Sequence, residues 1–208
     1  LMILIVSTLA TSTSMRDLLR WLSAIAIAAS AVALVYTSGT GLTSYGWVQS
    51  TSFTTSIALV LLSLMGFAVL TSPVKADSAG EWFALLLFTA LGSVVLSRVG
   101  NLAAVFLGIE VLSISLYVLV SFRYTSRISL RGGVTYLVLA GVGSAFLVFG
   151  SALIFATYGS LDIAELQAGA LAAAMPLLGM FGYGMFLVGV GFKLAATPFH
   201  MWAPDVYE

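Results

Sequence analysis

Two ionisable residues stand deep in long apolar stretches of this sequence, and both could take part in proton movement. Glu110 lies in the stretch that begins at Leu102, and Lys193 lies in a stretch that ends near Pro204. A carboxylate and an ammonium each bind or release one proton, and when they are close the charge of one changes the proton affinity of the other. His200 is a third candidate, because an imidazole titrates near neutral pH. The pattern predicts proton transfer through charged side chains.

The composition predicts the surroundings of these groups. Hydrophobic residues make up 61% of the 208 residues and charged residues only 8%, against about 25% charged residues in soluble domains. The chain is therefore expected to be an integral membrane protein. It has no cysteine and one histidine, which excludes cysteine-bound iron–sulfur clusters and argues against haem or a multi-histidine metal site. We expect no metal and no cofactor in this chain, and its zero net charge gives no reason to expect nucleic acid.

The apolar stretches are long enough for membrane-spanning helices, which need about 20 residues each. Continuous runs of this kind exclude a membrane β-barrel, whose strands alternate over segments of about ten residues. We predict an all-α, polytopic membrane helix bundle of about seven transmembrane helices. Because the chain starts inside an apolar run, it is expected to be part of a longer product. The predicted helices cover residues 1–13, 18–36, 54–72, 82–97, 102–122, 130–157 and a stretch that begins near Pro176.

The basic residues predict the orientation of the bundle. Six of them fall at alternate connections, whereas the opposite connections hold only Arg98. Lysine and arginine accumulate on the cytoplasmic side of membrane proteins, so the base-rich connections are expected to be cytoplasmic. The six bases are Arg16, Arg20, Lys75, Arg123, Arg127 and Arg131.

Glu110 is predicted to lie roughly 12 Å inside the membrane, because it follows Leu102 by eight residues at about 1.5 Å each. A charged side chain at mid-membrane costs at least about 2.5 kcal/mol, so it usually faces protein or a hydrated cavity. Ser113, Tyr117 and Ser121 follow at spacings that share one helical face with Glu110, and this face should point into protein. The alternative to a proton-carrying role is a protonated, purely structural glutamate.

Lys193 is predicted to sit at a break in the last helix. The segment from Leu166 to Pro204 has 39 residues, and a continuous helix of that length would measure roughly 58 Å, about twice the membrane core. Pro198 is expected to supply the break, because it lacks an N–H and its ring clashes with the carbonyl of Leu194. The freed carbonyls and the negative helix end would favour an ammonium. The alternative is a lysine whose ammonium reaches the membrane surface while its stem stays buried.

Two further features have ordinary structural explanations. His200 stands between Phe199 and Trp202 in an aromatic stretch, and a packed, hydrogen-bonded imidazole explains it as well as a proton relay does. The glycine-rich "GYGMFLVGVG" follows no strand and is not a nucleotide-binding loop. Its glycines are expected to let helices approach closely, as small residues do in membranes. The glycines of this region stand at 179, 182, 184, 189 and 191.

Two segments give the sequence a resemblance to a known family. "VGVGFKLAATPFHMWAPDVYE" at 188–208 and "NLAAVFLGIEVLSISLYVL" at 101–119 resemble the antiporter-like subunits of proton-pumping NADH:quinone oxidoreductase, respiratory complex I, and in particular the subunit N type. The first segment is the more specific, because sibling subunits and cation antiporters end this region differently. The resemblance runs from about Glu81 to Glu208 and continues before that only as a helix pattern.

The resemblance implies a role for the two buried charges. Glu110 and Lys193 would form a charge pair whose protonation is coupled to proton passage, with no redox step in this chain. NADH, FMN, iron–sulfur clusters and quinone would belong to partner subunits. Thr135 precedes Tyr136 where the family usually has a lysine, so the relay is expected to run through water or to be altered.

The resemblance also implies an arrangement and a location. Residues 1–80 would form three N-terminal transmembrane helices, and residues 81–208 would begin the first five-helix antiporter-like unit. The expected partners are other membrane subunits of complex I and lipid, in a bacterial inner (plasma) membrane. A subunit of a sodium/proton antiporter or of a membrane-bound hydrogenase is the alternative function, and a non-transporting membrane scaffold is another.

Overall fold

The structure, a computed structural model, describes residues 13–38, 46–75, 78–172 and 176–207, and these are folded almost entirely as helices. The helix predicted over residues 1–13 therefore lies outside the described part of the chain, apart from its last residue. The described helices are α2 (Thr13–Ser38), α3 (Ser52–Thr71), α4 (Ala79–Ser97), α5 (Leu102–Val120), α6 (Arg127–Tyr158), α7 (Ile163–Ala172), α8 (Leu177–Lys193), the 3-10 helix η2 (Phe199–Trp202) and α9 (Ala203–Tyr207).

Five of these helices, α2 to α6, are long and apolar enough to cross a membrane, and α8 is a shorter apolar helix of 17 residues. The prediction of a polytopic membrane helix bundle is confirmed, because the chain folds into apolar helices of membrane-spanning length. Each predicted span within the described residues corresponds to one helix. Helices α3 and α5 begin where a polar side chain caps them: Thr51 accepts from the backbone N–H of Thr54 at 3.2 Å, and Asn101 accepts from that of Ala103 at 2.8 Å. Such caps satisfy backbone donors that have no partner inside the helix.

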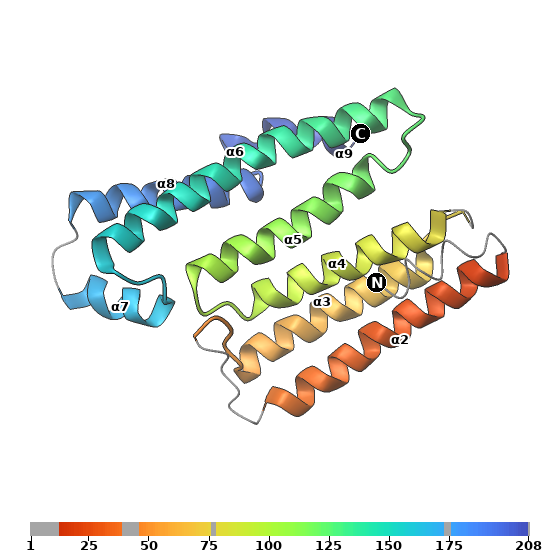
Figure 1. The fold of residues 1–208 in the computed structure, drawn as a ribbon, viewed down its shortest axis with the longest axis horizontal. Helices are drawn as coiled ribbons and strands as arrows, with labels where there is room; N and C mark the ends of the chain where they lie inside the picture. Colours follow the sequence, from red (N-terminus) through yellow and green to blue (C-terminus); the bar gives the residue numbers. More distant parts are fainter. Residues whose placement is uncertain (1–12, 39–45, 76–77, 173–175, 208) are drawn as a thin grey trace.

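Helices α2 to α6 lie side by side and run alternately in opposite directions, and α8 packs along α6 (Figure 1). One core joins α2, α3 and α4, with Phe83 of α4 fully buried at its centre. A second core joins α5, α6 and η2, and a third joins α5, α6 and α7. The second core is the one that borders Lys193.

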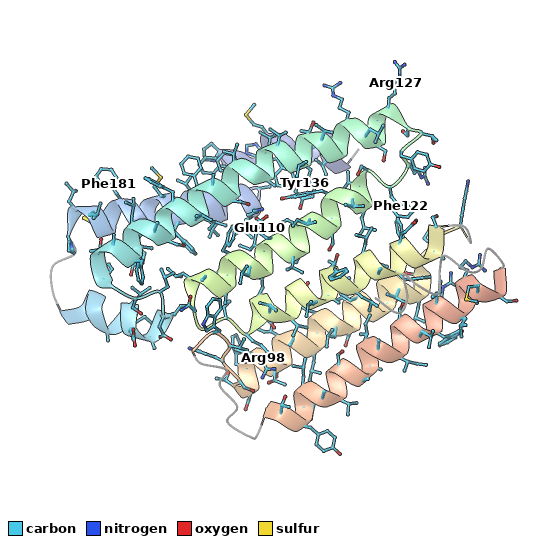
Figure 2. All side chains as sticks on the ribbon, in the orientation of Figure 1. Arg98, Glu110, Phe122, Arg127, Tyr136 and Phe181 are labelled. Carbon is cyan, nitrogen blue, oxygen red and sulfur yellow. The ribbon has the colours of Figure 1, made fainter. Side chains whose placement is uncertain are left out.

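The bundle has one base-rich end, as the alternation of basic residues predicts. Arg127 and Arg98 lie at opposite ends of the bundle, with Glu110 between them (Figure 2). At the base-rich end, Arg20 of α2 donates to the backbone carbonyl of Ser72 after α3, at 3.1 Å. The six predicted bases therefore share one end, and Arg98 stands at the other.

The end that holds Arg98 is held together by backbone hydrogen bonds between three connections. Gln49 N donates to Arg98 O at 2.7 Å, which joins the segment before α3 to the turn after α4. Leu102 N donates to Leu161 O at 2.9 Å, which joins the start of α5 to the α6–α7 connection. Arg98 itself is 8% exposed, and its guanidinium donates to the hydroxyl of Ser50.

The connection after α6 contains a short helix that is not among the helices predicted from the sequence. This helix, α7, begins after Asp162. The Asp162 carboxylate accepts hydrogen bonds from the backbone N–H groups of Ala164 at 2.9 Å and Glu165 at 3.3 Å. This is N-capping by an aspartate, and Leu166 anchors the helix because it is buried.

Candidate functional site

Helix α5 carries an acid and two hydroxyl groups on one face. Glu110, Ser113 and Tyr117 follow each other at three and four residues, which places their side chains one above another on a helix. Ser113 and Tyr117 are buried, which confirms that this face points into protein. Ser121, predicted on the same stripe, instead donates its hydroxyl to the backbone carbonyl of Tyr117 at 2.9 Å. Of the predicted stripe, Glu110, Ser113 and Tyr117 are therefore the residues whose side chains can contact other helices.

Helix α8 ends at Lys193, so the predicted break is present but begins before the proline. Ala196 N donates to Gly191 O at 2.9 Å, and Ala195 N donates to Phe192 O at 3.3 Å. These two bonds, with Ala195 at φ 49°, make the left-handed helix ending known as a Schellman motif. Pro198 follows the ended helix and does not itself end it.

The first residues after the break turn back onto α6. The indole N–H of Trp202 donates to Phe192 O at 3.2 Å, which gives that carbonyl a second partner. The Trp202 ring stacks on Tyr136 of α6 with ring centroids 4.8 Å apart. Tyr136 in turn meets Tyr117 edge to face at 4.7 Å. The broken end is thus satisfied by its own chain, which leaves the Lys193 ammonium available to other groups.

Two pairs of glycines bring α8 close to α6. A Cβ built on Gly189 would lie 2.7 Å from the backbone oxygen of Gly143, and one on Gly150 would lie 2.8 Å from that of Gly182. Both distances are shorter than real Cβ contacts, so the helices meet backbone to backbone at these points. The expectation of close packing holds for Gly182 and Gly189. It does not hold for the glycine at 184, which faces open space.

Lys193, at the end of α8, contacts Glu110 of α5. The Lys193 Nζ lies 3.3 Å from Glu110 Oε1, and the two form an ion pair. The same ammonium lies 3.3 Å from Ser113 Oγ and 3.3 Å from Tyr117 Oη. An ammonium has three N–H donors, so α5 offers one acceptor for each. The side chain of Lys193 is only 9% exposed and that of Glu110 is 25% exposed. The lysine therefore does not reach the membrane surface, and that alternative is excluded.

Ser144 of α6 completes the site, although no sequence pattern singles it out. Its hydroxyl contacts Glu110 Oε1, the oxygen that also faces Lys193. The same hydroxyl lies 3.1 Å from the backbone oxygen of Ala140, one turn earlier on α6. Three helices, α5, α6 and α8, therefore contribute to one polar cluster inside an apolar bundle.

The other predicted candidates lie outside this cluster. His200 is exposed on η2, and its imidazole makes no hydrogen bond or ion pair with any described residue. Thr135 is half-buried on α6, beside Tyr136. Among the described residues no group of three or more His, Cys, Asp or Glu side chains could hold a metal ion.

The cluster can hold or exchange a proton. Transfer of one proton from the ammonium to Glu110 Oε1 converts the ion pair into a neutral amine and a carboxylic acid, and the reverse transfer restores it. Ser113 and Tyr117 carry hydroxyls that can accept from an ammonium or donate to a neutral amine. Both forms of Lys193 therefore find partners on α5, which buried polar groups require.

The chain matches a protein family and several known proteins. Residues 99–208 match the family described as NADH:quinone oxidoreductase/Mrp antiporter, TM. A protein named NADH-quinone oxidoreductase subunit N, from Trichlorobacter lovleyi, is 37% identical over 200 residues, which cover 91% of this chain and 40% of that protein. The chain thus spans about two fifths of the length of this curated relative.

Two solved structures share the fold. A chain of respiratory complex I from Thermus thermophilus with bound aureothin matches 99% of this chain and 46% of its own length, with a TM-score of 0.76 and 27% identity. A chain of the membrane-bound sulfane sulfur reductase, an archaeal respiratory membrane complex, matches 99% of this chain and 44% of its own length, with a TM-score of 0.79. At 21% identity, the second match is evidence for the fold alone.

Proposed function

Because the chain belongs to the NADH:quinone oxidoreductase/Mrp antiporter transmembrane family, we propose that it is a proton-translocating membrane subunit of NADH:quinone oxidoreductase. The observation that carries this proposal is the ion pair between Glu110 and Lys193. It joins a mid-span acid to the lysine that ends a broken helix, in a bundle with few other buried charges. The relative named as subunit N of that enzyme supports this choice over a sodium/proton antiporter or hydrogenase subunit.

The role of the pair is electrostatic coupling. Two unit charges 3.3 Å apart interact by about 5 kcal/mol at an effective dielectric constant of about 20. Protonating Glu110, or moving Lys193 away from it, removes this attraction from the remaining charge. Each 1.4 kcal/mol corresponds to about a tenfold change in an equilibrium, so a change at one residue strongly alters the proton occupancy of the other. Charge can pass along the bundle by this coupling, without a redox step in this chain.

Partners and location follow from the same proposal. NADH oxidation and quinone reduction, with FMN and iron–sulfur clusters, would take place in partner subunits. The subunit would lie in a bacterial inner (plasma) membrane beside other membrane subunits of complex I, with its base-rich end in the cytoplasm. Residues 1–80 would form the N-terminal helices, and residues 81–208 would begin the first antiporter-like unit. His200 remains a proposed relay member on the cytoplasmic side of the pair.

A non-transporting scaffold is the competing function, because Thr135 occupies the place of the lysine that the family usually has. The two functions differ in what Glu110 and Lys193 do. In a scaffold the pair would stabilise helix packing, and its loss would reduce assembly. In a proton-translocating subunit its loss would reduce proton uptake by the complex that does assemble.

The test uses the complete complex in sealed membrane vesicles. Glu110→Gln keeps the shape of the side chain but removes its charge, and Lys193→Ala removes the ammonium. Glu165→Gln and Lys75→Ala are matched controls, because both residues are exposed near helix ends. NADH-driven proton uptake, normalised to assembled complex, should fall in the first two variants and not in the controls. Wild-type uptake in both site variants, or a loss explained entirely by failed assembly, would overturn the proposal.

A further inference from the structure

Ser144 has a contact that sets it apart from the other described serine in the middle of α6. Ser151, seven residues later, donates its hydroxyl to the backbone oxygen of Leu147 at 2.8 Å, one turn earlier. Ser144 has the corresponding acceptor, Ala140 O at 3.1 Å, and in addition contacts Glu110 Oε1. A serine hydroxyl carries one proton. It can therefore donate to Ala140 or to Glu110 at a given moment, and not to both.

The two acceptors suit two protonation states of Glu110. When Glu110 is ionised, the Ser144 hydroxyl can donate to Oε1, which then receives hydrogen bonds from both Ser144 and Lys193. When Glu110 carries a proton, the carboxyl group becomes a donor, and the Ser144 oxygen can accept from it while its own proton turns to Ala140 O. A hydroxyl has lone pairs for this second arrangement. Ser144 and the carboxyl group of Glu110 are therefore hydrogen-bonded to each other in both states.

We propose that Ser144 is a positioning residue for Glu110, holding the carboxyl group beside Lys193 in both protonation states by turning its hydroxyl between the carboxyl group and the backbone oxygen of Ala140. This inference rests on the proposed function, because it assumes that Glu110 changes its protonation state. It assigns to α6 a part in proton coupling that the charged residues of α5 and α8 do not provide. Without the hydroxyl, the neutral carboxyl group has no fixed partner on α6 and is free to rotate away from the lysine.

The test compares Ser144→Ala with two matched variants in the complete complex. Ser144→Thr keeps a hydroxyl that can reach the same two acceptors, and Ser151→Ala removes a hydroxyl from the same helix without touching Glu110. A hydrogen bond to a charged group corresponds to roughly a tenfold change in an equilibrium. We expect NADH-driven proton uptake per assembled complex to fall roughly tenfold in Ser144→Ala. Ser144→Thr should retain most of the uptake, and Ser151→Ala should match the wild type.

Two further measurements separate positioning from a general structural effect. In a Glu110→Gln background, Ser144→Ala should cause no additional loss of proton uptake, because the carboxyl group that Ser144 positions is already absent. In infrared difference spectra, the carboxyl C=O band that disappears in Glu110→Gln should shift in Ser144→Ala and stay in place in Ser151→Ala. A Ser144→Ala variant that loses uptake equally in both backgrounds, with an unshifted band, would show a structural role and overturn the inference.

The same variants distinguish failure of this inference from failure of the proposed function. If Glu110→Gln lowers uptake while Ser144→Ala behaves like Ser151→Ala, the proposed function stands and the role of Ser144 is refuted. If Glu110→Gln itself keeps wild-type uptake, both are refuted.

Discussion

The close approach of α6 and α8 makes Gly189 the most informative position at which to perturb the packing. An alanine Cβ at 189 would lie 2.7 Å from the backbone oxygen of Gly143 and 2.7 Å from the backbone N of Leu147. Ordinary contacts begin at 3.4 Å, so the two helices must move apart locally by about 0.7 Å. Both obstructing atoms belong to the α6 backbone, so no side-chain rotation can relieve the overlap. Overpacking of this kind costs about 1–3 kcal/mol.

The expected result is that Gly189→Ala lowers the thermal stability of the complex and weakens the charge pair. Lys193 lies one turn beyond residue 189 on the same helix, so a shift of α8 there moves the ammonium relative to Glu110. The assay is the temperature at which detergent-solubilised complex loses half of its assembled form, measured together with proton uptake in vesicles. The control is Gly184→Ala on the same helix, where an added Cβ meets nothing within 4 Å. Equal stability and equal uptake in the two variants would refute the backbone contact between α6 and α8.

Three other outcomes are expected. The effects of Glu110→Gln and Lys193→Ala on proton uptake should be non-additive, since the two residues form one pair. If the double variant loses as much transition free energy as the two single variants together, the two residues have independent roles. Trp202→Phe should keep the ring stacking but lose the indole hydrogen bond to the end of α8. The free energy of unfolding should fall by about 1 kcal/mol, and an unchanged melting profile would contradict this. Cysteines at Ser52 and Thr125 should react with an impermeant label from opposite sides of the membrane, since the two residues lie at opposite ends of the bundle, and labelling from one side would contradict the arrangement of the spans.

The sequence predicts the membrane spans well, because apolar length is set by the membrane and needs no tertiary information. The differences lie at the ends. Helix α6 begins at Arg127, three residues before the prediction, because Ser126 accepts a hydrogen bond from Ser129 N and caps it. Helix α7 escaped prediction because its 10 residues are too few for a span. Its signal was nevertheless present in Asp162, an N-cap residue followed three residues later by Glu165.

The candidate site was predictable where one helix determines it. The spacing of Glu110, Ser113 and Tyr117 follows from helical geometry, and the burial of Ser113 and Tyr117 confirms the predicted face. That Lys193 would pair with Glu110 was implied by the family resemblance, and the structure shows the ion pair. Ser144 could not be found in the same way. Its position opposite Glu110 depends on how α5 and α6 are aligned along their axes, and a serine in an apolar helix gives no sign of that alignment.

The break in α8 was predicted from Pro198, but the geometry that ends the helix depends on an alanine. Glycine is the usual residue at the left-handed position of such an ending, and "KLAAT" contains none. The sequence therefore predicts a break near Lys193, but not the left-handed alanine that forms it. The Schellman hydrogen bonds satisfy the last carbonyls locally, and the Trp202 indole adds a hydrogen bond to Phe192 O from 10 residues further along the chain.

The left-handed backbone conformation of Ala195 limits which amino-acid substitutions this position can accept. A residue with a side chain pays about 1–2 kcal/mol to adopt such a backbone, and the penalty is greatest for branched side chains. Single-base changes of an alanine codon lead to threonine, serine, proline, valine, glycine and an acidic residue. Proline would fix φ near −65° and remove the N–H that bonds Phe192 O, while valine and threonine are branched. Glycine alone relieves the strain, so natural variants at this position should be drawn mainly from glycine, alanine and small polar residues.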